Sequence, residues 1–331
     1  MKVSVLGAGG WGTTLAVLLH YNGHNVTLWE YKKSYAKELS KRRENKIYLP
    51  GIIIPDEIKI TSDLEESTSD KNLIVLAVPS QFLRKVVEKI DYHSIKDTIL
   101  VSVSKGIEKE TLMTMSQMMK DVHHRLSKEQ IGVLSGPSHA EEVSKRIPTA
   151  VVAASIEKET SQTIQTVFMN SFFRVYKSTD ILGVELGGAF KNVIAIGAGI
   201  IDGAGFGDNT KAAIMTRGVA EISRLGLVMG ARPETFAGLS GMGDLIVTCM
   251  SKHSRNRYVG EQIGRGKKLK EVLKSMEMVA EGVETTKSVN QLAARYKVET
   301  PIANEVYQIL FEDKDPIKAT TDLMTRDMKF E

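Results

Sequence analysis

The stretch VSVLGAGGWGTTLAVLL, from Val3 to Leu19, decides the fold. A short β-branched run leads into Gly7, Gly9 and Gly12, which form a Gly-x-Gly-x-x-Gly pattern, and a helix-forming run follows. In a dinucleotide-binding fold the first glycine permits a tight turn, the second lets the backbone approach a pyrophosphate, and the third permits close packing of helix on strand. The N–H groups at the helix start then bind phosphate. The stretch therefore predicts a strand, a phosphate-binding turn and a helix.

The composition is that of an ordinary soluble enzyme with room for two domains. The chain has 331 residues, of which 42% are hydrophobic and 25% charged, and 44 basic against 40 acidic residues give a net charge of +4. This excess is too small to indicate a nucleic-acid partner. The single cysteine, Cys249, excludes an intrachain disulfide and favours a reducing compartment. We interpret it as a small buried hydrophobic residue.

The sequence carries no recognisable targeting segment, and no uninterrupted apolar run approaches the roughly 18 residues of a membrane span. We therefore expect a cytoplasmic protein without membrane insertion.

The first part of the chain alternates strand-like and helix-like runs. Continuous β-branched and leucine runs are typical of strands buried on both faces of a parallel sheet. The expected strands are 2–9, 25–30, 72–79, 98–106, 131–138 and 149–155, and the expected helices are 12–23, 33–46, 80–90 and 111–126. This alternation predicts an α/β fold with a Rossmann-like, doubly wound, mostly parallel sheet, which we assign to residues 1–180 as the dinucleotide-binding domain.

Strand patterns fade after about residue 180. The remaining periodic segments predict helices over 181–203, 210–230, 254–266, 269–276, 285–298 and 301–311. We assign residues 181–331 to an all-helical, substrate-binding domain. The methionines at 113–119, in the first domain, are interpreted as core-filling residues rather than as a metal site.

The strand ends carry the candidate cofactor residues. The run LWEYKK places Glu30 where an acid would bond the ribose 2′-hydroxyl of NAD, whereas Lys32 is suited to the 2′-phosphate of NADP. The residues leave NAD(H) and NADP(H) both open. Two further strand ends, Ala77–Ser80 and Val101–Gly106, point to the same crevice, because ligands bind at the carboxyl ends of parallel strands. Lys105 is thereby expected at its mouth.

A lysine in a small, apolar helix is the main feature of the second half. Lys191 lies in ELGGAFKNVIAIGAG, and none of its neighbours one turn away is acidic. Such a lysine either serves as an acid or base or extends its ammonium to water. The run GLSGMGDLIVTC favours the first alternative, because Asp244 and Thr248 lie one helical turn apart and face the same way. Arg255 of SRNR is suited to bidentate phosphate recognition.

Seven ordered segments resemble the NAD(P)-dependent glycerol-3-phosphate dehydrogenases in their bacterial form. They span residues 7 to about 289 and read GAGGWGTTLA, VSVSKGIE, SGPSHAEEV, ELGGAFKNVIAIGAGI, LSGMGDLIVTC, SRNR and VAEGVETTKSV. The resemblance implies reversible reduction of dihydroxyacetone phosphate to sn-glycerol 3-phosphate, with NAD(H) and/or NADP(H) as cofactor. It further implies a supply of the glycerol backbone for phospholipids, and a homodimer.

The resemblance also implies a role for each matching residue. Lys191 would be the general acid and base, and Lys105 and Asp244 would polarise the substrate and hold Lys191. No metal ion is expected. The substrate site would comprise Lys105, Gly136, Ser138, Lys191, Asn192, Asp244, Thr248, Ser254, Arg255 and Asn256. The cofactor site would comprise Gly7, Gly9, Gly10, Trp11, Gly12, Glu30, Tyr31, Lys32, Pro79, Lys105, Ala140, Arg255, Val279 and Glu281.

The chain departs from the family pattern where many bacterial members have LWARR. Glu30 replaces a small residue and Tyr31 replaces an arginine, which removes a phosphate clamp. We therefore expect mixed cofactor use that favours NADH. Gly10 replaces a common serine without loss of its N–H. Two rival functions remain: a β-hydroxyacid dehydrogenase, which would recognise a carboxylate, and a cofactor-binding redox sensor without turnover.

Overall fold

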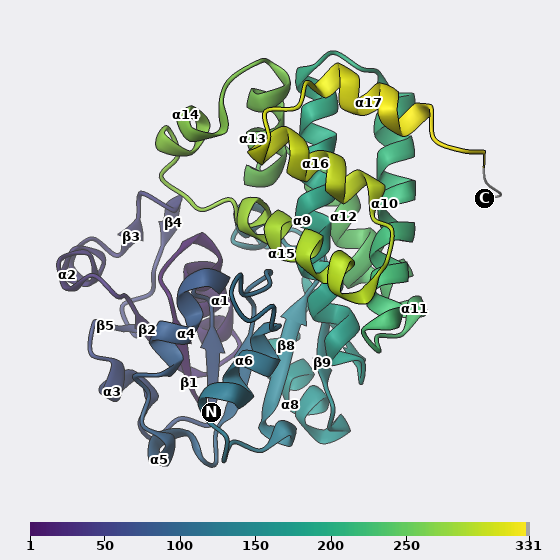
Figure 1. Ribbon diagram of the computed structural model, residues 1–331. Coiled ribbons are helices and arrows are strands. Elements are labelled where there is room, and N and C mark those ends of the chain that lie inside the picture. The colour runs from purple at the N-terminus through teal and green to yellow at the C-terminus, as the bar shows by residue number, and fades with distance from the viewer. Residues whose placement is uncertain (329–331) are drawn as a thin grey trace. The chain divides into compact units, whose positions relative to one another are not determined.

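The computed structural model describes residues 1–328 and divides into two compact units (Figure 1). The first unit comprises residues 1–108 and 113–185, and the second comprises 109–112 and the chain from 186 onward. The last three residues of the predicted helical domain, 329–331, lie outside the described part.

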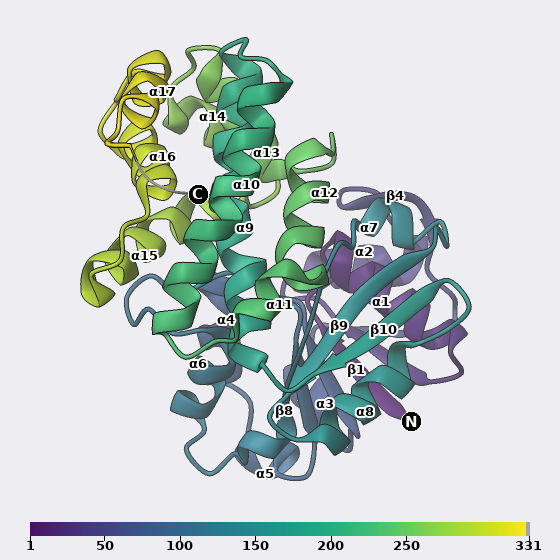
Figure 2. The same cartoon turned by 90° about the vertical axis from the view of Figure 1, so that its right-hand side faces the viewer.

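The first unit is built on one eight-stranded sheet. Its strand order is β10-β9-β8-β7-β6-β1-β2-β5, and all neighbours pair in parallel except β8 with β9. Figure 2 shows β9 and β10 side by side with α8 (Lys158–Phe168) next to them. The strands are β1 (Lys2–Leu6), β2 (Asn25–Trp29), β5 (Lys59–Thr61), β6 (Leu73–Leu76), β7 (Ile99–Ser102), β8 (Ile131–Ser135), β9 (Thr149–Ser155) and β10 (Phe173–Ser178).

Helices cover both faces of this sheet, which confirms the predicted doubly wound fold. Alternate residues of β6 belong to two different cores: Val75 to the core that also contains residues of α1 and α8, and Leu76 to the core that contains residues of α4 and α6. Met115, Met118 and Met119 are buried in the second core, as the sequence predicted. The helices are α1 (Gly10–Tyr21), α2 (Lys33–Arg42), α3 (Leu64–Thr68), α4 (Ser80–Val87), α5 (Tyr92–Ile95), α6 (Met115–Val122), α7 (Ala140–Val143) and α8 (Lys158–Phe168).

The predicted helix over 33–46 is wrong beyond Arg42. Arg43 has a φ of 53°, a left-handed conformation that ends α2. The chain then forms an antiparallel hairpin from β3 (Glu44–Asn45) and β4 (Leu49–Ile53). The elements β5, β10 and α8 also have no counterpart among the predicted strands and helices.

The second unit is helical throughout its described residues, as predicted. Figure 1 shows α9 and α10 as upright helices, with α16 and α17 crossing in front of them. The helices are α9 (Ile181–Gly203), α10 (Asp208–Val228), α11 (Pro233–Ala237), α12 (Asp244–Met250), α13 (Arg255–Gly264), α14 (Leu269–Lys274), α15 (Glu281–Tyr296), α16 (Pro301–Phe311) and α17 (Pro316–Met324), and a π-helical turn, η2 (Leu239–Gly243), precedes α12.

Glycines let α9 and α13 cross at backbone contact. A Cβ added at Gly199 would lie 2.1 Å from the carbonyl oxygen of Arg257, and one added at Gly260 would lie 1.9 Å from that of Ile196. Gly203 and Gly264 repeat the pattern one turn later. The small residues of α9 therefore serve close helix packing.

Among the described residues, α9 is the one helix long and apolar enough to cross a membrane by length and composition. Its most apolar window is wholly buried inside the protein, as in the core helix of a soluble fold.

We expect Gly260→Ala to lower the free energy of unfolding by about 1–3 kcal/mol, because the new methyl group overlaps the backbone of α9. Urea denaturation measures the loss. Gly207→Ala is the matched control, because a Cβ at Gly207 meets no atom within 4 Å. Equal losses in the two variants would contradict the packing argument.

Candidate active site

The glycine-rich loop lies at the carboxyl end of β1, next to β6. The strand order reverses between these two strands, the position at which doubly wound sheets bind ligands. Gly7 has a φ of +112°, and a Cβ there would lie 2.7 Å from the carbonyl oxygen of Ala77. A Cβ at Gly12 would lie 1.9 Å from the Gly7 carbonyl oxygen. Gly7 and Gly12 are thus required by backbone contacts.

Gly9 differs, because a Cβ there would meet no described atom within 4 Å. It is the N-cap of α1, whose first turn holds no acidic residue and receives no side-chain cap among the described residues. The N–H groups of a first helical turn have no partner within the helix and favour an anion. Open space above Gly9 and donors behind it fit a pyrophosphate.

The residues after β2 surround Glu30. Its carboxylate accepts a hydrogen bond of 2.9 Å from the Lys32 backbone N–H. Burial raises the pKa of the Glu30 carboxyl, and the backbone N–H groups of Lys32 and Ala8 partly offset this effect. Tyr31 is 70% exposed, and Lys32 is also exposed. Glu30 is therefore fixed beside the glycine-rich loop.

The ends of β7 and β8 bring a second group together in the first unit. Lys105 Nζ donates to the Gly136 carbonyl oxygen at 2.9 Å, and the Ser138 hydroxyl donates to the same oxygen at 2.8 Å. Gly136 has a φ of +139°, and a Cβ there would lie 3.0 Å from the Val151 backbone. Lys105 lies after the end of β7, as predicted, and its hydrogen bond brings it together with Gly136 and Ser138, two other residues of the predicted substrate site.

Lys191, Asp244 and Thr248 meet in the second unit. Lys191 Nζ lies 3.0 Å from Asp244 Oδ1 and 2.6 Å from Thr248 Oγ1. The Thr248 hydroxyl donates to the Asp244 carbonyl oxygen at 2.6 Å, so its oxygen is free to accept from the ammonium. The Lys191 and Asp244 side chains are 6% and 2% exposed. The ammonium does not extend to water; it is a buried, paired charge.

Close backbone packing makes this short contact possible. A Cβ at Gly187, one turn before Lys191, would lie 2.9 Å from the Ser240 carbonyl oxygen in η2. The π-helical turn leads directly into α12, which begins at Asp244. Single π turns are frequent at functional sites because they re-aim the residues that follow.

A series of hydrogen bonds between side-chain amides begins at Asn192, the residue after Lys191 in α9. Asn256 Nδ2 donates to Asn192 Oδ1 at 2.8 Å, and Asn256 Oδ1 accepts from the Gly282 N–H at 2.9 Å. Ser254 caps α13 by accepting from the Arg257 N–H at 3.1 Å. These hydrogen bonds link α9, α13 and α15.

The two arginines of SRNR differ. Arg257 pairs with Asp202 at 2.7 Å and Glu261 at 3.3 Å. Arg255 is exposed, and its guanidinium has no ion-pair or hydrogen-bond partner within residues 1–328. Of the two, Arg255 is the one available to an anion.

The other predicted residues are dispersed over element starts and loops. In the first unit Gly10 and Trp11 open α1, Pro79 is the N-cap of α4 and Ala140 opens α7. In the second unit Glu281 opens α15 and Val279 is exposed before it.

Two buried polar residues of the first unit escaped the sequence analysis. Glu185 caps α6 by accepting from the Ser116 N–H at 2.8 Å, and Asn45 bonds to the glycine-rich loop. A polar residue inside an apolar or helix-like run was the available signal. Cys249, by contrast, is buried as predicted, and burial raises the pKa of its thiol to about 12.

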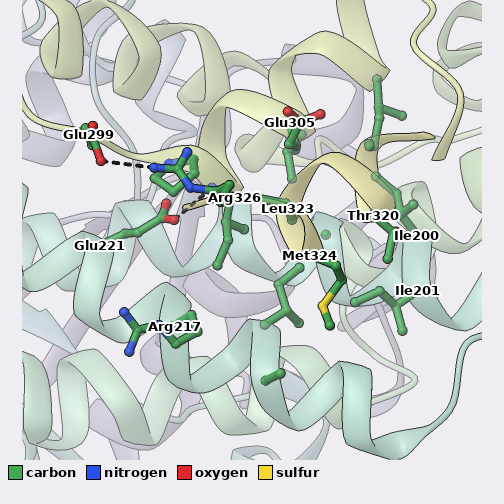
Figure 3. A pocket seen from close by; sticks show the side chains of 18 of the residues that line it. Ile200, Ile201, Arg217, Glu221, Glu299, Glu305, Thr320, Leu323, Met324 and Arg326 are labelled. Atoms are coloured by element: carbon green, nitrogen blue, oxygen red, sulfur yellow. Dashed lines mark hydrogen bonds and ion pairs between the residues drawn. The ribbon is translucent and has the colours of Figure 1, made fainter. Parts of the chain in front are cut away.

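The second unit also contains a pocket of about 850 Å³, lined mainly by α9, α10, α16 and α17 (Figure 3). Among the described residues, neither Lys191 nor Asp244 lines it. Glu221 does, and its carboxylate caps α16 by accepting from the N–H groups of Ile302 at 2.7 Å and Ala303 at 3.2 Å. Burial raises the pKa of Glu221 to about 7.

The fold and the loop define a class. A doubly wound sheet with a Gly-x-Gly-x-x-Gly turn at its switch point, joined to a helical unit with a buried lysine, is typical of nicotinamide-dependent dehydrogenases.

Comparison with known proteins gives the family. Profiles described as NAD-dependent glycerol-3-phosphate dehydrogenase N-terminus and C-terminus match residues 2–161 and 180–321, and the chain belongs to this family. A glycerol-3-phosphate dehydrogenase [NAD(P)+] of Chlorobium phaeobacteroides (strain BS1) is 54% identical over 100% of this chain and 99% of its own length. The crystal structure of glycerol-3-phosphate dehydrogenase from Coxiella burnetii is 36% identical, with a TM-score of 0.90 over 98% of this chain and 99% of that one.

We expect Glu30→Ala to raise the ratio of kcat/KM for NADPH to that for NADH by about tenfold, because the carboxylate repels a 2′-phosphate. Steady-state kinetics with both cofactors measures the ratio. Glu38→Ala, an exposed change on α2, is the control. An unchanged ratio would mean that Glu30 does not face the ribose.

Glu221→Gln should flatten part of the pH dependence of stability. The pKa of Glu221 is about 7 in the folded state and 4.5 in the unfolded state. Protonated Glu221 therefore stabilises the folded state fully below pH 4.5, and this stabilisation is lost as the pH rises through 7. The loss amounts to about 3 kcal/mol, with Arg224 and Arg326 as the nearby charges. Denaturation of both proteins from pH 4.5 to 8 gives the difference, and parallel curves would refute the assignment.

Proposed function

We propose that the chain catalyses the reversible, NAD(P)H-dependent reduction of dihydroxyacetone phosphate to sn-glycerol 3-phosphate. The observation that carries the proposal is the buried Lys191, held by Asp244 and Thr248 in a member of the glycerol-3-phosphate dehydrogenase family. Such a paired ammonium supplies a proton in a dry environment.

The first unit holds the cofactor in this proposal. The N–H groups at the start of α1 bind the pyrophosphate, and Glu30, Tyr31 and Lys32 lie on the adenosine ribose side. When bound, the reduced nicotinamide supplies the hydride that converts the ketone carbon into a secondary alcohol carbon. The remaining proposed cofactor contacts are Gly7, Gly9, Gly10, Trp11, Gly12, Pro79, Lys105, Ala140, Arg255, Val279 and Glu281.

Lys191 donates the proton in the reductive direction. Negative charge develops on the ketone oxygen as the carbon is reduced, and the Lys191 ammonium neutralises it by transferring one proton. The adjacent Asp244 carboxylate favours the ammonium form and fixes its position. In the oxidative direction the neutral amine takes the hydroxyl proton back. Lys105 adds a second positive charge that stabilises the developing oxyanion.

The substrate phosphate is bound away from the reacting carbon. Arg255 is the exposed guanidinium without an internal partner in residues 1–328, and Ser254 and Asn256 flank it. Binding energy from the phosphate orients a small substrate. We propose that Gly136, Ser138, Asn192 and Thr248 complete the substrate site.

We further propose a cytoplasmic homodimer that supplies the glycerol backbone for phospholipids. Domain bounds of 1–180 for cofactor binding and 181–331 for substrate binding belong to the same proposal. The family match over both parts of the chain disfavours a β-hydroxyacid dehydrogenase.

The direct test is oxidation of NADH and NADPH by dihydroxyacetone phosphate, with 3-hydroxyisobutyrate and 6-phosphogluconate tested in the reverse direction. Turnover with dihydroxyacetone phosphate alone supports the proposal. Turnover only with a hydroxyacid would support the rival dehydrogenase, and NADH binding without any turnover would support a redox sensor.

Lys191→Met should lower kcat by at least about 10², because the proton donor is lost while the cofactor loop is untouched. Stopped-flow or steady-state rates give kcat, and NADH fluorescence should report nearly unchanged binding. Lys158→Met, at an exposed helix start, is the control. A wild-type rate in Lys191→Met would refute the acid/base role.

A further inference from the structure

The hairpin after α2 is anchored at both of its ends. We call residues 44–53 the strap. Arg43 Nη1 donates to the Ile58 carbonyl oxygen at 2.7 Å, and the Ile54 N–H donates to the Arg43 carbonyl oxygen at 2.8 Å. Glu44 Oε1 accepts from the Gly51 N–H at 3.0 Å. The Arg43–Ile58 bond joins the base of the strap to the segment before β5, and the other two bonds close the hairpin; these three bonds do not involve the glycine-rich loop.

Asn45 lies in the strap and is fully buried. Its Nδ2 donates to the Ala8 carbonyl oxygen and to Thr13 Oγ1, both at 2.8 Å. Its Oδ1 accepts from the Tyr35 hydroxyl at 2.7 Å and from the Tyr48 N–H at 3.1 Å. All four hydrogen-bonding positions of the amide are therefore used.

The partners fix the orientation of this amide. A backbone carbonyl only accepts and a backbone N–H only donates, so Nδ2 must face Ala8 and Oδ1 must face Tyr48. Burial raises the pKa of Tyr35 to about 12, so its hydroxyl remains a donor at every physiological pH. Asn45 is thus a fixed donor directed at the loop.

The loop is held at the residue between its first two glycines. Asn45 binds the carbonyl of Ala8, whereas the N–H of Ala8 interacts with Glu30. Thr13 lies in the first turns of α1, so one amide group bonds to both the loop and the helix. A Cβ at Gly10 would lie 2.6 Å from the Tyr48 carbonyl oxygen, so the strap also contacts the helix start.

We propose that Asn45 is a positioning residue for the dinucleotide: it presets the Gly7–Gly12 loop so that its N–H groups converge on the pyrophosphate. The inference rests on the proposed function for the identity of the ligand. Holding the loop in its binding conformation removes an ordering cost from association, so the effect falls on cofactor affinity rather than on proton transfer.

Asn45→Asp is the sharpest variant, because it keeps the shape and removes both donors. We expect the Kd for NADH, measured by fluorescence titration, to rise about tenfold or more, since the Ala8 carbonyl loses its donor and a carboxylate approaches the pyrophosphate. At saturating NADH, kcat and the KM for dihydroxyacetone phosphate should stay within about twofold of wild type.

Asn72→Ala is the matched control for stability alone. Asn72 Oδ1 accepts from the Lys2 N–H at 2.8 Å, at the start of β1, away from the loop. This variant should lower the melting temperature without changing the Kd for NADH. If Asn45→Asp does not fold, Tyr35→Phe replaces it in the titration. This variant removes the hydrogen bond from the Tyr35 hydroxyl to Asn45 Oδ1, so it should raise the Kd for NADH by a smaller factor.

An unchanged Kd for NADH in Asn45→Asp or in Tyr35→Phe, or an equal rise in Asn72→Ala, would overturn the inference. These titrations do not depend on turnover. If the wild type bound NADH but did not reduce dihydroxyacetone phosphate, the proposed function would fail while the role of Asn45 would still be measured.

Discussion

One buried ion pair constrains the helical unit. An ammonium removed from water is stable only if an opposite charge and hydrogen bonds lie close to it, and Lys191 has Asp244 at 3.0 Å and Thr248 at 2.6 Å. Asp244 is a short side chain, so its helix must come close to α9. The glycine at position 187 makes that approach possible, because a Cβ there would lie 2.9 Å from the Ser240 carbonyl oxygen. The missing side chain at position 187 therefore lets Asp244 reach the buried ammonium of Lys191.

In the sheet unit, by contrast, the backbone N–H groups at the start of α1 stay accessible. Gly7 and Gly12 bring the loop close to β6 and α1, whereas the space above Gly9 stays open. An open loop needs support from behind, and the amide of Asn45 provides it without adding charge. In the proposed role of this loop, a neutral amide suits the pyrophosphate, because a carboxylate there would repel it.

Local sequence patterns predicted those parts of the glycine-rich loop and of the Lys191 cluster that have a regular residue spacing. The glycine spacing placed the loop, and the one-turn spacing of Asp244 and Thr248 placed both on one face of α12. Contacts between distant segments could not be predicted in this way. Asn45 lies 37 residues from Ala8, and a basic, helix-like run concealed the left-handed Arg43 that ends α2. Strands β5 and β10 were not predicted because tertiary pairing, rather than a continuous apolar run, defines them.

The segment SRNR shows that a motif alone does not reveal which of its two arginines is available to bind an anion. Both arginines are equally suited to phosphate by residue type. In the fold, Arg257 is neutralised by Asp202, which also pairs with Lys211, so this cluster is a closed structural network. Arg255 is exposed, and within residues 1–328 its guanidinium has no partner. An incoming dianion gains more from a cation that has no carboxylate to displace, so the internal pairing of Arg257 supports the proposal that Arg255 binds the substrate phosphate.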